Sequence, residues 1–401
     1  MSLKGIFYMK KTLIALAVAA TAATSANAFV VYEQDGSKVE LSGSFRMFLG
    51  RNPDANNGRG DLTNDGSRLI VKATHDLGNG LSALAGYQIR FEDSDGNGDA
   101  FKQAGSPSAP IPPSNFGSPT TRELFGGFKL ADVGSLTFGR QSTSADEVLQ
   151  DMTYWRTGWY NPITKYADKG AKFRSAEWNG FSFGADYVFG HSNKDIDTYV
   201  SKGYKYKSGY ALTAFYNTKV GEHKFEFAAG YTHDNYDGKF DSAVAGYTQE
   251  SASNTAKRRD IWLVHGDYTY GPFYLALNYG QVREKYDNLD WANPPKVWGQ
   301  TDDGPRKGHY ALVDFRYQFT DIVGLFGQWE YLNYKYDNVD LFNAYDKSQK
   351  NKMQNRYQMG VDYRLGRSAV VYVMYEHERN KKLNDETDKE HIFGTGLRVY
   401  F

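Results

Sequence analysis

The chain contains no cysteine, so it can form neither disulfide bridges nor thiolate metal sites. It also lacks an excess of charge of one sign, because 47 lysine and arginine residues are balanced by 47 aspartate and glutamate residues. A protein that binds nucleic acid usually carries a clear positive excess, so the even balance argues against that class of partner. The absence of cysteine also suits passage through an oxidising compartment.

Long apolar runs are missing after the first 28 residues, where none approaches the roughly 18–20 residues that a membrane-spanning helix needs. Near the N-terminus, Lys10 and Lys11 precede a short apolar run over 13–20, and the small residues 26–28 follow. This arrangement is typical of an export signal with a cleavage site.

We expect the signal to start at Met9 and to be cleaved after Ala28. Residues 1–28 would then be removed, and residues 29–401 would form one mature domain. This N-terminal signal predicts a protein that is exported from the cytoplasm.

Alternating apolar and polar residues are plentiful in the mature chain. Tyr357, Met359 and Val361 share one side of an extended chain, while Arg356 and Gln358 share the other. We predict sixteen such strands. Their bounds lie near 38–51, 66–77, 80–93, 120–131, 133–141, 168–178, 180–192, 203–218, 223–237, 258–270, 272–287, 308–320, 323–338, 355–366, 368–382 and 390–401.

The connections between these strands alternate in length. Short turns such as Asn179-Gly180 and Gly366-Arg367 alternate with long polar loops, and the loop over 106–119 holds several of the 11 prolines. This asymmetry and the aromatic content of 16% are typical of outer-membrane β-barrels. A secreted all-β protein with one buried face is the alternative interpretation.

The last twelve residues, EHIFGTGLRVYF, read as a strand that ends on Phe401. Leu397, Val399 and Phe401 share its apolar side, and Arg398 lies on the other side. A closing strand that pairs with the first strand would leave no unpaired edge in lipid. We therefore predict an all-β fold, a closed sixteen-stranded antiparallel transmembrane barrel.

Several stretches together resemble the general porins of Gram-negative outer membranes. They are VYEQDGSKVELSGSFR (31–46), DGSRLIVKATHDLGNGL (65–81), TRELFGGFKLADVGSLTFGR (121–140) and the closing GLRVYF. The resemblance implies a homotrimer of sixteen-stranded barrels. It further implies a third long loop that folds inward as a constriction, whose acidic residues face arginines on the barrel wall.

For the basic wall, the resemblance matches Arg68 and Arg122 to constriction arginines of the family, through GSRL and TTREL. The family's basic residue in the first strand falls at Ser44, and Arg46 lies two residues along the same face. The alternation of polar and apolar residues places Lys72 on the same face of its strand as Arg68. The further candidates are Arg90 and Arg174. For any one of these residues, the alternative is an ordinary solvated charge of the lumen or rim.

The third long loop should run over 141–165. Its acids are Asp146, Glu147 and Asp151, although GWYNPIT stands where the family has PEFGG. The alternative for each acid is a helix cap or a side chain turned away from the pore.

Four aromatic residues crowd the same loop, namely Tyr154, Trp155, Trp159 and Tyr160. They could stack on sugar rings in a saccharide-preferring channel, or they could pin the loop to the wall, which is the interpretation we favour.

A short acidic segment reproduces the start of a calcium-binding loop, with oxygen-bearing residues at Asp93, Asp95, Asn97 and Asp99. Ala104 stands where such a loop ends in glutamate. An acidic, glycine-rich surface loop without metal is therefore the alternative, and we expect no other cofactor.

The resemblance and the residues together predict an outer-membrane porin. Such a channel passes ions and small hydrophilic solutes passively, so we expect no enzymatic activity. The expected partners are two further copies of the chain, outer-membrane lipid, lipopolysaccharide and the solutes themselves. A non-conducting surface adhesin or structural barrel is the competing class.

Overall fold

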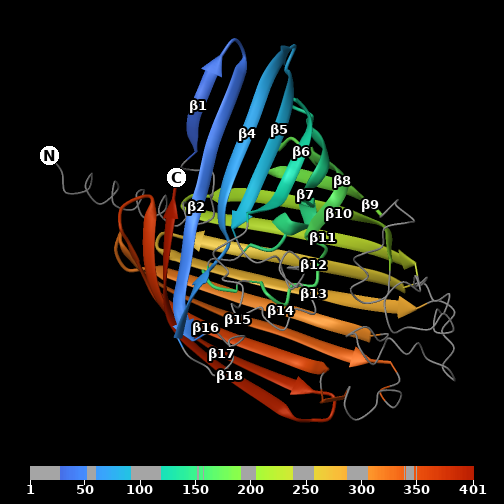
Figure 1. Ribbon diagram of the computed structural model, residues 1–401, viewed down its shortest axis with the longest axis vertical. Coiled ribbons are helices and arrows are strands. Elements are labelled where there is room, and N and C mark those ends of the chain that lie inside the picture. The colour runs from blue at the N-terminus through green and yellow to red at the C-terminus, as the bar shows by residue number, and fades with distance from the viewer. Residues whose placement is uncertain are drawn as a thin grey trace, which may run out of the picture.

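The structure is a computed structural model that describes residues 28–51, 60–91, 119–150, 153–156, 158–190, 205–237, 257–286, 306–337, 339, 347–348 and 350–401. In this part of the chain, eighteen strands form one sheet that closes into a barrel (Figure 1). The short strands β1 (Phe29–Gln34) and β3 (Gly60–Asn64) both pair with β2 (Ser37–Arg51). The other sixteen form the antiparallel barrel and confirm the predicted fold class.

The barrel strands begin and end within a few residues of the predicted bounds. After β2 they are β4 (Ser67–Gly78), β5 (Leu81–Phe91), β6 (Thr120–Leu130), β7 (Gly134–Ser142), β8 (Tyr166–Ser175), β9 (Phe181–Phe189), β10 (Lys205–Val220), β11 (His223–Asp237), β12 (Lys257–Tyr270), β13 (Phe273–Tyr286), β14 (Arg306–Gln318), β15 (Val323–Tyr336), β16 (Asn351–Arg364), β17 (Ala369–Lys382) and β18 (Thr387–Tyr400).

The barrel closes where β18 pairs with β2, from Gly394 opposite Gly50 to Tyr400 opposite Ser44. Figure 1 draws these two strands, red and blue, side by side. Beyond β18, the Phe401 N–H donates to the Gly43 carbonyl at 3.1 Å, and the Gly43 N–H donates to the Phe401 carbonyl at 2.7 Å. The closing pairing therefore includes Phe401, as the terminal-strand pattern predicts.

Short connections of two to five residues join the strands at one end of the barrel. Asp35 and Gly36 have φ of 50° and 75°, and Asn179 and Gly180 have φ of 52° and 86°. Positive φ at both central residues matches the twist of a tight hairpin, and Asp or Asn followed by Gly adopts it at the least cost. The opposite end carries the long connections.

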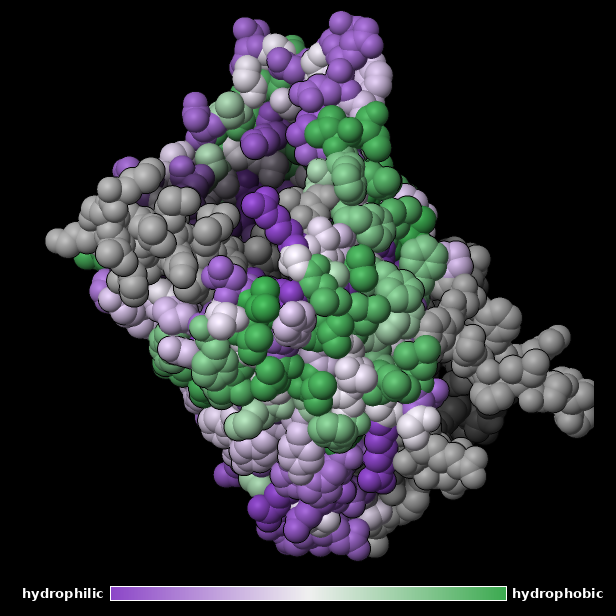
Figure 2. All heavy atoms as spheres, turned by 90° about the vertical axis from the view of Figure 1, so that its left-hand side faces the viewer, coloured by the Kyte–Doolittle hydropathy of each residue, from purple (hydrophilic) through white to green (hydrophobic). Residues whose placement is uncertain are grey.

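The two faces of the barrel sheet differ in polarity. Outward positions carry large apolar side chains such as Leu277, Met359 and Phe393, whose exposures are 54%, 57% and 66%. On the side drawn in Figure 2, apolar residues gather in a band between hydrophilic ends. Such a band faces lipid in an outer-membrane barrel. In the described part of the chain, no helix is long and apolar enough to cross a bilayer.

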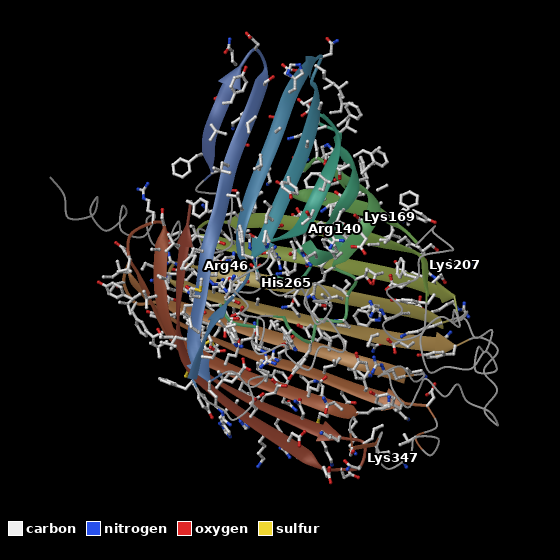
Figure 3. The ribbon with its side chains drawn as sticks, viewed as in Figure 1. Arg46, Arg140, Lys169, Lys207, His265 and Lys347 are labelled. Atoms are coloured by element: carbon white, nitrogen blue, oxygen red, sulfur yellow. The ribbon has the colours of Figure 1, made fainter. Side chains whose placement is uncertain are left out.

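Inward positions are mostly polar and closely packed. Arg46 on β2 and His265 on β12 are both buried, and Figure 3 labels their side chains. His265 contacts Asn278 at 2.8 Å and Asp267 at 3.0 Å through its two ring nitrogens. The polar side of each strand therefore forms the inner wall.

Candidate functional site

The connection between β7 and β8 is the segment that reaches the inner wall. The structure describes residues 143–150, 153–156 and 158–165 of it, and η1 (Ser144–Glu147) is a single 3₁₀ turn at its start. The Thr143 N–H donates to the Lys165 carbonyl at 3.0 Å, and the Thr143 hydroxyl donates to the Thr164 carbonyl at 2.7 Å. The segment therefore leaves and rejoins the sheet at one place. We call it the inner loop.

Both ends of the inner loop are held by carboxylates of the wall. The Ser144 N–H donates to Asp186 on β9 at 3.0 Å, and the Ser144 hydroxyl donates to the same carboxylate. At the returning end, the Thr164 hydroxyl donates to Asp234 on β11 at 2.6 Å. Asp186 and Asp234 are both buried, so the hydrogen bonds from the loop help to compensate these carboxylates for the loss of water, and Arg259 also pairs with Asp234 at 3.2 Å.

Between these ends, Val148 and Ile163 pack on an apolar part of the inner wall. The wall side of this cluster consists of Ala211, Phe215, Ala228, Ile261, Leu263, Val282, Tyr310, Leu312 and Leu332. Apolar side chains facing a lumen would contact water if nothing covered them. Burying each one contributes about 1.5–3 kcal/mol, which favours the loop in this position.

The second half of the loop inserts two aromatic side chains into the wall formed by β14–β18 and β2. Tyr154 stacks on Tyr372 with ring centroids 4.5 Å apart, and its hydroxyl donates to Asp362 at 3.1 Å. Trp155 stacks on Phe48 at 4.2 Å. Both rings are buried.

Next to these aromatics, a buried cluster of charges joins the loop to β15, β16 and β17. Arg356 lies 3.4 Å from Glu330, 3.5 Å from Glu376 and 3.1 Å from Glu378. Arg156 of the loop pairs with Glu376 at 3.0 Å. Removing Arg356 would leave the buried Glu330 carboxylate without its ion-pair partner, and the ion pairs of Arg156 tie the loop to the same cluster.

The four predicted aromatic residues therefore divide into two groups. Tyr154, Trp155 and Tyr160 are buried, and the Tyr160 ring lies over the Arg356 guanidinium at 4.5 Å. Trp159 is 60% exposed. These positions favour the interpretation in which the aromatic side chains anchor the loop, with Trp159 as the exception.

The predicted loop acids also differ from one another. Glu147 pairs with Lys172 at 2.7 Å and with Arg174 at 3.0 Å. Burial raises the pKa of the Glu147 carboxyl, but these two cations outweigh burial and hold the pKa below its ordinary value. Asp146 is exposed, whereas Asp151 lies outside the described residues.

Arginines of the predicted basic wall lie opposite one another on neighbouring strands. Arg68 on β4 lies opposite Ser44 on β2 and opposite Arg90 on β5. Arg46 lies opposite Arg398 on β18, and its Nε donates to the Ser44 hydroxyl at 2.8 Å. Four adjacent strands thus bring these four arginines close together.

The remaining predicted basic residues have different surroundings. Lys72 is exposed and lies opposite Glu40. Arg122 lies where the register of β5 and β6 shifts, and its guanidinium stacks on the Tyr166 ring at 4.1 Å. Arg174 and Lys172 both form ion pairs with Glu147. At Arg122 the shift in register breaks the simple alternation.

Several residues that hold the inner loop were not predicted as site residues. Alternation did place Arg356, Asp362 and Arg398 on the polar face of their strands. No local pattern, however, indicates that Arg356 meets Glu330 and Glu376, or that Arg398 meets Asp65 at 2.5 Å, 333 positions away.

The predicted calcium loop, with Asp93, Asp95, Asn97 and Asp99, lies outside the described residues, and calcium there stays a prediction. Among the residues that are described, no three histidine or acidic side chains come together in a way that could hold a metal ion.

Comparison with known proteins agrees with this architecture. The family model for Gram-negative porins matches residues 14–383. The major outer membrane protein of Pasteurella multocida strain Pm70 is 33% identical over 396 residues, which cover 98% of this chain and all of that protein.

Two solved structures share the fold at low sequence identity. The trimer form of Vibrio cholerae OmpT has a TM-score of 0.60 and 17% identity, and the match covers 92% of this chain and 100% of that one. An anion-selective porin from Comamonas acidovorans has a TM-score of 0.59 and 16% identity, with 91% and 100% covered. The chain therefore belongs to the Gram-negative porin family and forms an outer-membrane channel through which small solutes diffuse.

Proposed function

We propose that the inner loop narrows this channel to a fixed aperture, through which ions and small hydrophilic solutes pass passively. The observation that carries the proposal is the attachment of the loop along its described length. Asp186 and Asp234 hold its two ends, and Asp362 with the Arg356 cluster holds its middle. A segment attached at several points can keep a constant width, which a diffusion pore needs.

The charges at this aperture would then set ion preference. Arg46, Arg68 and Arg90 lie together on β2, β4 and β5, with Lys72 and Arg122 on the same side of the barrel. We propose that these residues form the basic wall and that Asp146 forms part of the acidic side. Glu147 contributes less charge to the aperture because Lys172 and Arg174 balance it. Opposed charges beside a low-dielectric wall order water and disfavour apolar solutes.

Two finer features belong to the same proposal. We propose a homotrimer embedded in outer-membrane lipid and lipopolysaccharide; the trimer form of Vibrio cholerae OmpT, which has the same fold, supports the assembly. We also propose that residues 9–28 act as a cleaved export signal, which sequencing of the mature N-terminus would test.

A saccharide-preferring channel is the second candidate, and exposed Trp159 is the observation that favours it. The Arg156 guanidinium lies 4.8 Å from the Trp159 ring, which keeps an aromatic face beside a cation. Sugar rings stack on such faces. Transport of uncharged sugars of equal size, compared between the natural protein and Trp159→Ala, would separate the two candidates.

Planar-bilayer recording tests the main proposal. Purified, folded protein should give stepwise increases in conductance, and the reversal potential in a salt gradient should give its ion preference. Folded protein that inserts without conductance steps would contradict the proposal and favour the adhesin or structural barrel. Wild-type conductance after removal of the described loop anchors would contradict the role assigned to the inner loop.

A further inference from the structure

On the outer face of the barrel, two histidine side chains stack on each other across the last two strands. His377 on β17 lies directly opposite His391 on β18, with ring centroids 4.5 Å apart and an interplanar angle of 26°. His391 is exposed and His377 is partly exposed. Both alternate along their strands with buried inward residues, so their rings point away from the lumen. We call these two residues the outer histidine pair.

The hydrogen bonds of the outer histidine pair engage only one nitrogen of each ring. His377 Nδ1 contacts the Glu390 carbonyl oxygen at 3.3 Å. Because a carbonyl oxygen only accepts, the Nδ1 atom of a neutral His377 carries the proton, and its Nε2 atom carries a lone pair. His391 Nδ1 contacts the Tyr375 hydroxyl at 2.6 Å, and this oxygen can accept in the same way. Neither Nε2 atom hydrogen-bonds to another described residue.

This arrangement matches the way in which histidine binds metal ions. A metal-binding imidazole usually donates its other ring N–H to an oxygen, which fixes the tautomer and the orientation of the ring. In the outer histidine pair, a backbone carbonyl and a tyrosine hydroxyl supply those oxygens. Residues directly opposite on antiparallel strands have Cβ atoms about 4.5–5.5 Å apart, and the torsion χ2 of histidine is soft. A rotation of the two rings therefore lets both Nε2 atoms reach one ion.

The neighbouring residues place the outer histidine pair at the boundary between lipid and water. Toward the connection 383–386, the next outward residues are Arg379 and Lys389, which are exposed and lie directly opposite each other. In the other direction they are Tyr375 and Phe393. Charged side chains need water, and aromatic side chains gather where headgroups meet hydrocarbon. This end of the barrel carries the long connections, which face the outside, so ions in the external water can reach the pair.

The same neighbours decide which class of ion fits. Arg379 and Lys389 repel cations, and neither they, Tyr375 and Phe393, nor Tyr357 on β16 carry a carboxylate. Calcium and magnesium ions prefer several oxygen ligands, so they fit these surroundings poorly. Neutral imidazole instead suits zinc and copper. The chemistry of the outer histidine pair therefore favours a divalent transition-metal ion.

We propose that the outer histidine pair binds one divalent transition-metal ion, zinc or copper, through its two Nε2 atoms. Water would fill the remaining coordination positions, as it does at metal sites with few protein ligands. Within the described chain, the part of β18 before Gly394 pairs with β17 alone, because the pairing with β2 begins at Gly394. The ion would therefore link the closing strand to its neighbour at the outer end of the barrel. The site does not depend on the constriction or on conduction.

Titration with Cu²⁺ tests the site, because the electron paramagnetic resonance spectrum of copper reports its nitrogen ligands. The sample is folded protein without a histidine tag, in uncharged detergent above pH 7, where most imidazoles are neutral. We expect one copper ion per chain with two nitrogen ligands. His377→Phe and His391→Phe keep a ring for stacking but remove a lone pair. Each should raise the Kd about tenfold or more, because the second imidazole binds at high effective concentration.

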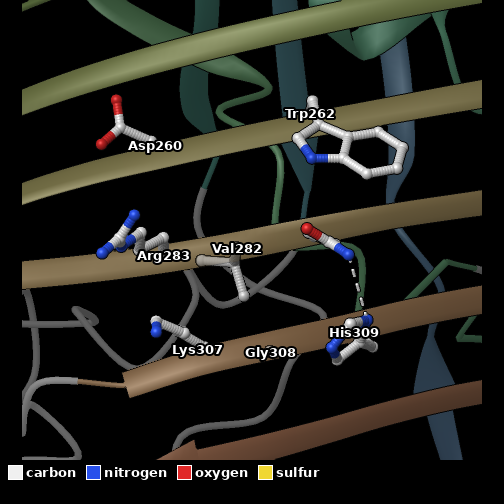
Figure 4. A pocket seen from close by; sticks show the side chains of 8 residues that line it. Asp260, Trp262, Val282, Arg283, Lys307, Gly308 and His309 are labelled. Carbon is white, nitrogen blue, oxygen red and sulfur yellow. Dashed lines mark hydrogen bonds between the residues drawn. The ribbon is translucent and has the colours of Figure 1, made fainter.

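The matched control is His309→Phe on β14. His309 is also exposed on the outer face, and its Nδ1 atom contacts a tyrosine hydroxyl, that of Tyr279, at 2.8 Å. Its cross-strand neighbours are Gln281 and Asn333 rather than a second histidine. Figure 4 shows His309 beside the hollow that it lines together with Trp262. The Kd of this variant for copper should stay within about twofold of the natural value.

The copper titration can overturn the proposal in three ways. A spectrum with a single nitrogen ligand would do so, and so would a loss of affinity in only one of the two variants of the pair, because one imidazole would then suffice. An equal loss in His309→Phe would show that the metal binds separate histidines of the outer face.

Heat-dependent migration on gels gives a second readout with Zn²⁺. Saturating zinc should raise the temperature at which the natural barrel changes its mobility, because an ion that binds only the folded state stabilises it. A chelator should reverse the rise, and neither variant of the outer histidine pair should show it. A transition temperature of the natural protein that zinc leaves unchanged would overturn the link between β17 and β18.

Folding of the variants is checked on the same gels. Each phenylalanine variant should migrate as a folded barrel and should conduct like the natural protein, so that a loss of metal binding is not a loss of structure. Where a phenylalanine variant migrates as unfolded, His377→Gln or His391→Gln takes its place, with the same expected loss of copper affinity.

Discussion

At the scale of single residues, the inner face places some like charges directly opposite each other and places at least one carboxylate between two cations. Arg68 and Arg90 lie directly opposite each other, as do Arg46 and Arg398. Glu147, by contrast, lies between Lys172 and Arg174. The proposed ion preference therefore depends on arginines that face one another across neighbouring strands and on the Glu147 carboxylate between its two cations.

Arg68→Ala and Arg122→Ala should each shift permeability toward cations, by about twofold to fivefold in the anion-to-cation permeability ratio. A unit charge about 4 Å from an ion contributes about 1 kcal/mol in water, which sets this range. Reversal potentials in a salt gradient would measure the shift. If both variants retain the natural ion preference, neither arginine lines the aperture.

Glu147→Gln should shift permeability in the opposite direction. The substitution removes the negative charge that balances Lys172 and Arg174, so two cations would face the lumen without their carboxylate. We expect the anion-to-cation ratio to rise by about twofold to fivefold, with the same measurement. Glu177→Gln offers a control, because Glu177 is exposed beside the short turn of β8 and β9. A fall in the ratio for Glu147→Gln would contradict the assignment.

At the scale of elements, the inner loop depends on aromatic side chains that the wall encloses. Trp155→Ala should loosen the loop, because truncating a buried tryptophan typically costs about 3–5 kcal/mol. We expect larger and noisier single-channel conductance from this variant, and Tyr154→Ala should behave similarly. Planar-bilayer recording would detect both effects.

The control for this prediction is Trp159→Ala in the same loop. Trp159 is 60% exposed, so its truncation should leave the conductance level and its noise near the natural values. Equal noise in Trp155→Ala and Trp159→Ala would show that burial of Trp155 does not hold the loop.

The sequence predicted the barrel strands well because a strand with one lipid-facing side repeats every two residues, and that pattern is local. It missed the short strands β1 and β3, which both pair with β2; residues 60–64 of β3 show no clear alternation. The short 3₁₀ turn η1 could not be bounded from sequence, because its position follows from the contacts of Ser144 with Asp186.

At the scale of the whole molecule, closure of the barrel brings the first and last strands together. A Cβ on Gly43 would lie 2.5 Å from the Arg68 carbonyl oxygen and 2.7 Å from the Phe401 ring. The pairing of β18 with β2 therefore requires glycine at position 43, and the Phe401 ring packs against this residue.

Deletion of Phe401 should lower the free energy of unfolding by about 1–3 kcal/mol. It removes two backbone hydrogen bonds with Gly43 and the contact of the Phe401 ring with Gly43. The measurement is the temperature at which folded barrels change their gel mobility. Phe401→Leu keeps the backbone bonds and should lose less stability than the deletion. An unchanged transition temperature after deletion would show that β18 closes the barrel without Phe401.

The sequence by itself determined the number of barrel strands, their apolar and polar faces, the closing strand at Phe401 and the family. All of these follow from local alternation, turn residues and short motifs. Only the tertiary structure decided where the inner loop lies and what holds it. Arg156 meets Glu376, and Tyr154 meets Asp362, across more than 200 positions of sequence. Such contacts arise because closing the sheet brings distant strands around one lumen, where buried charges and apolar side chains must find partners.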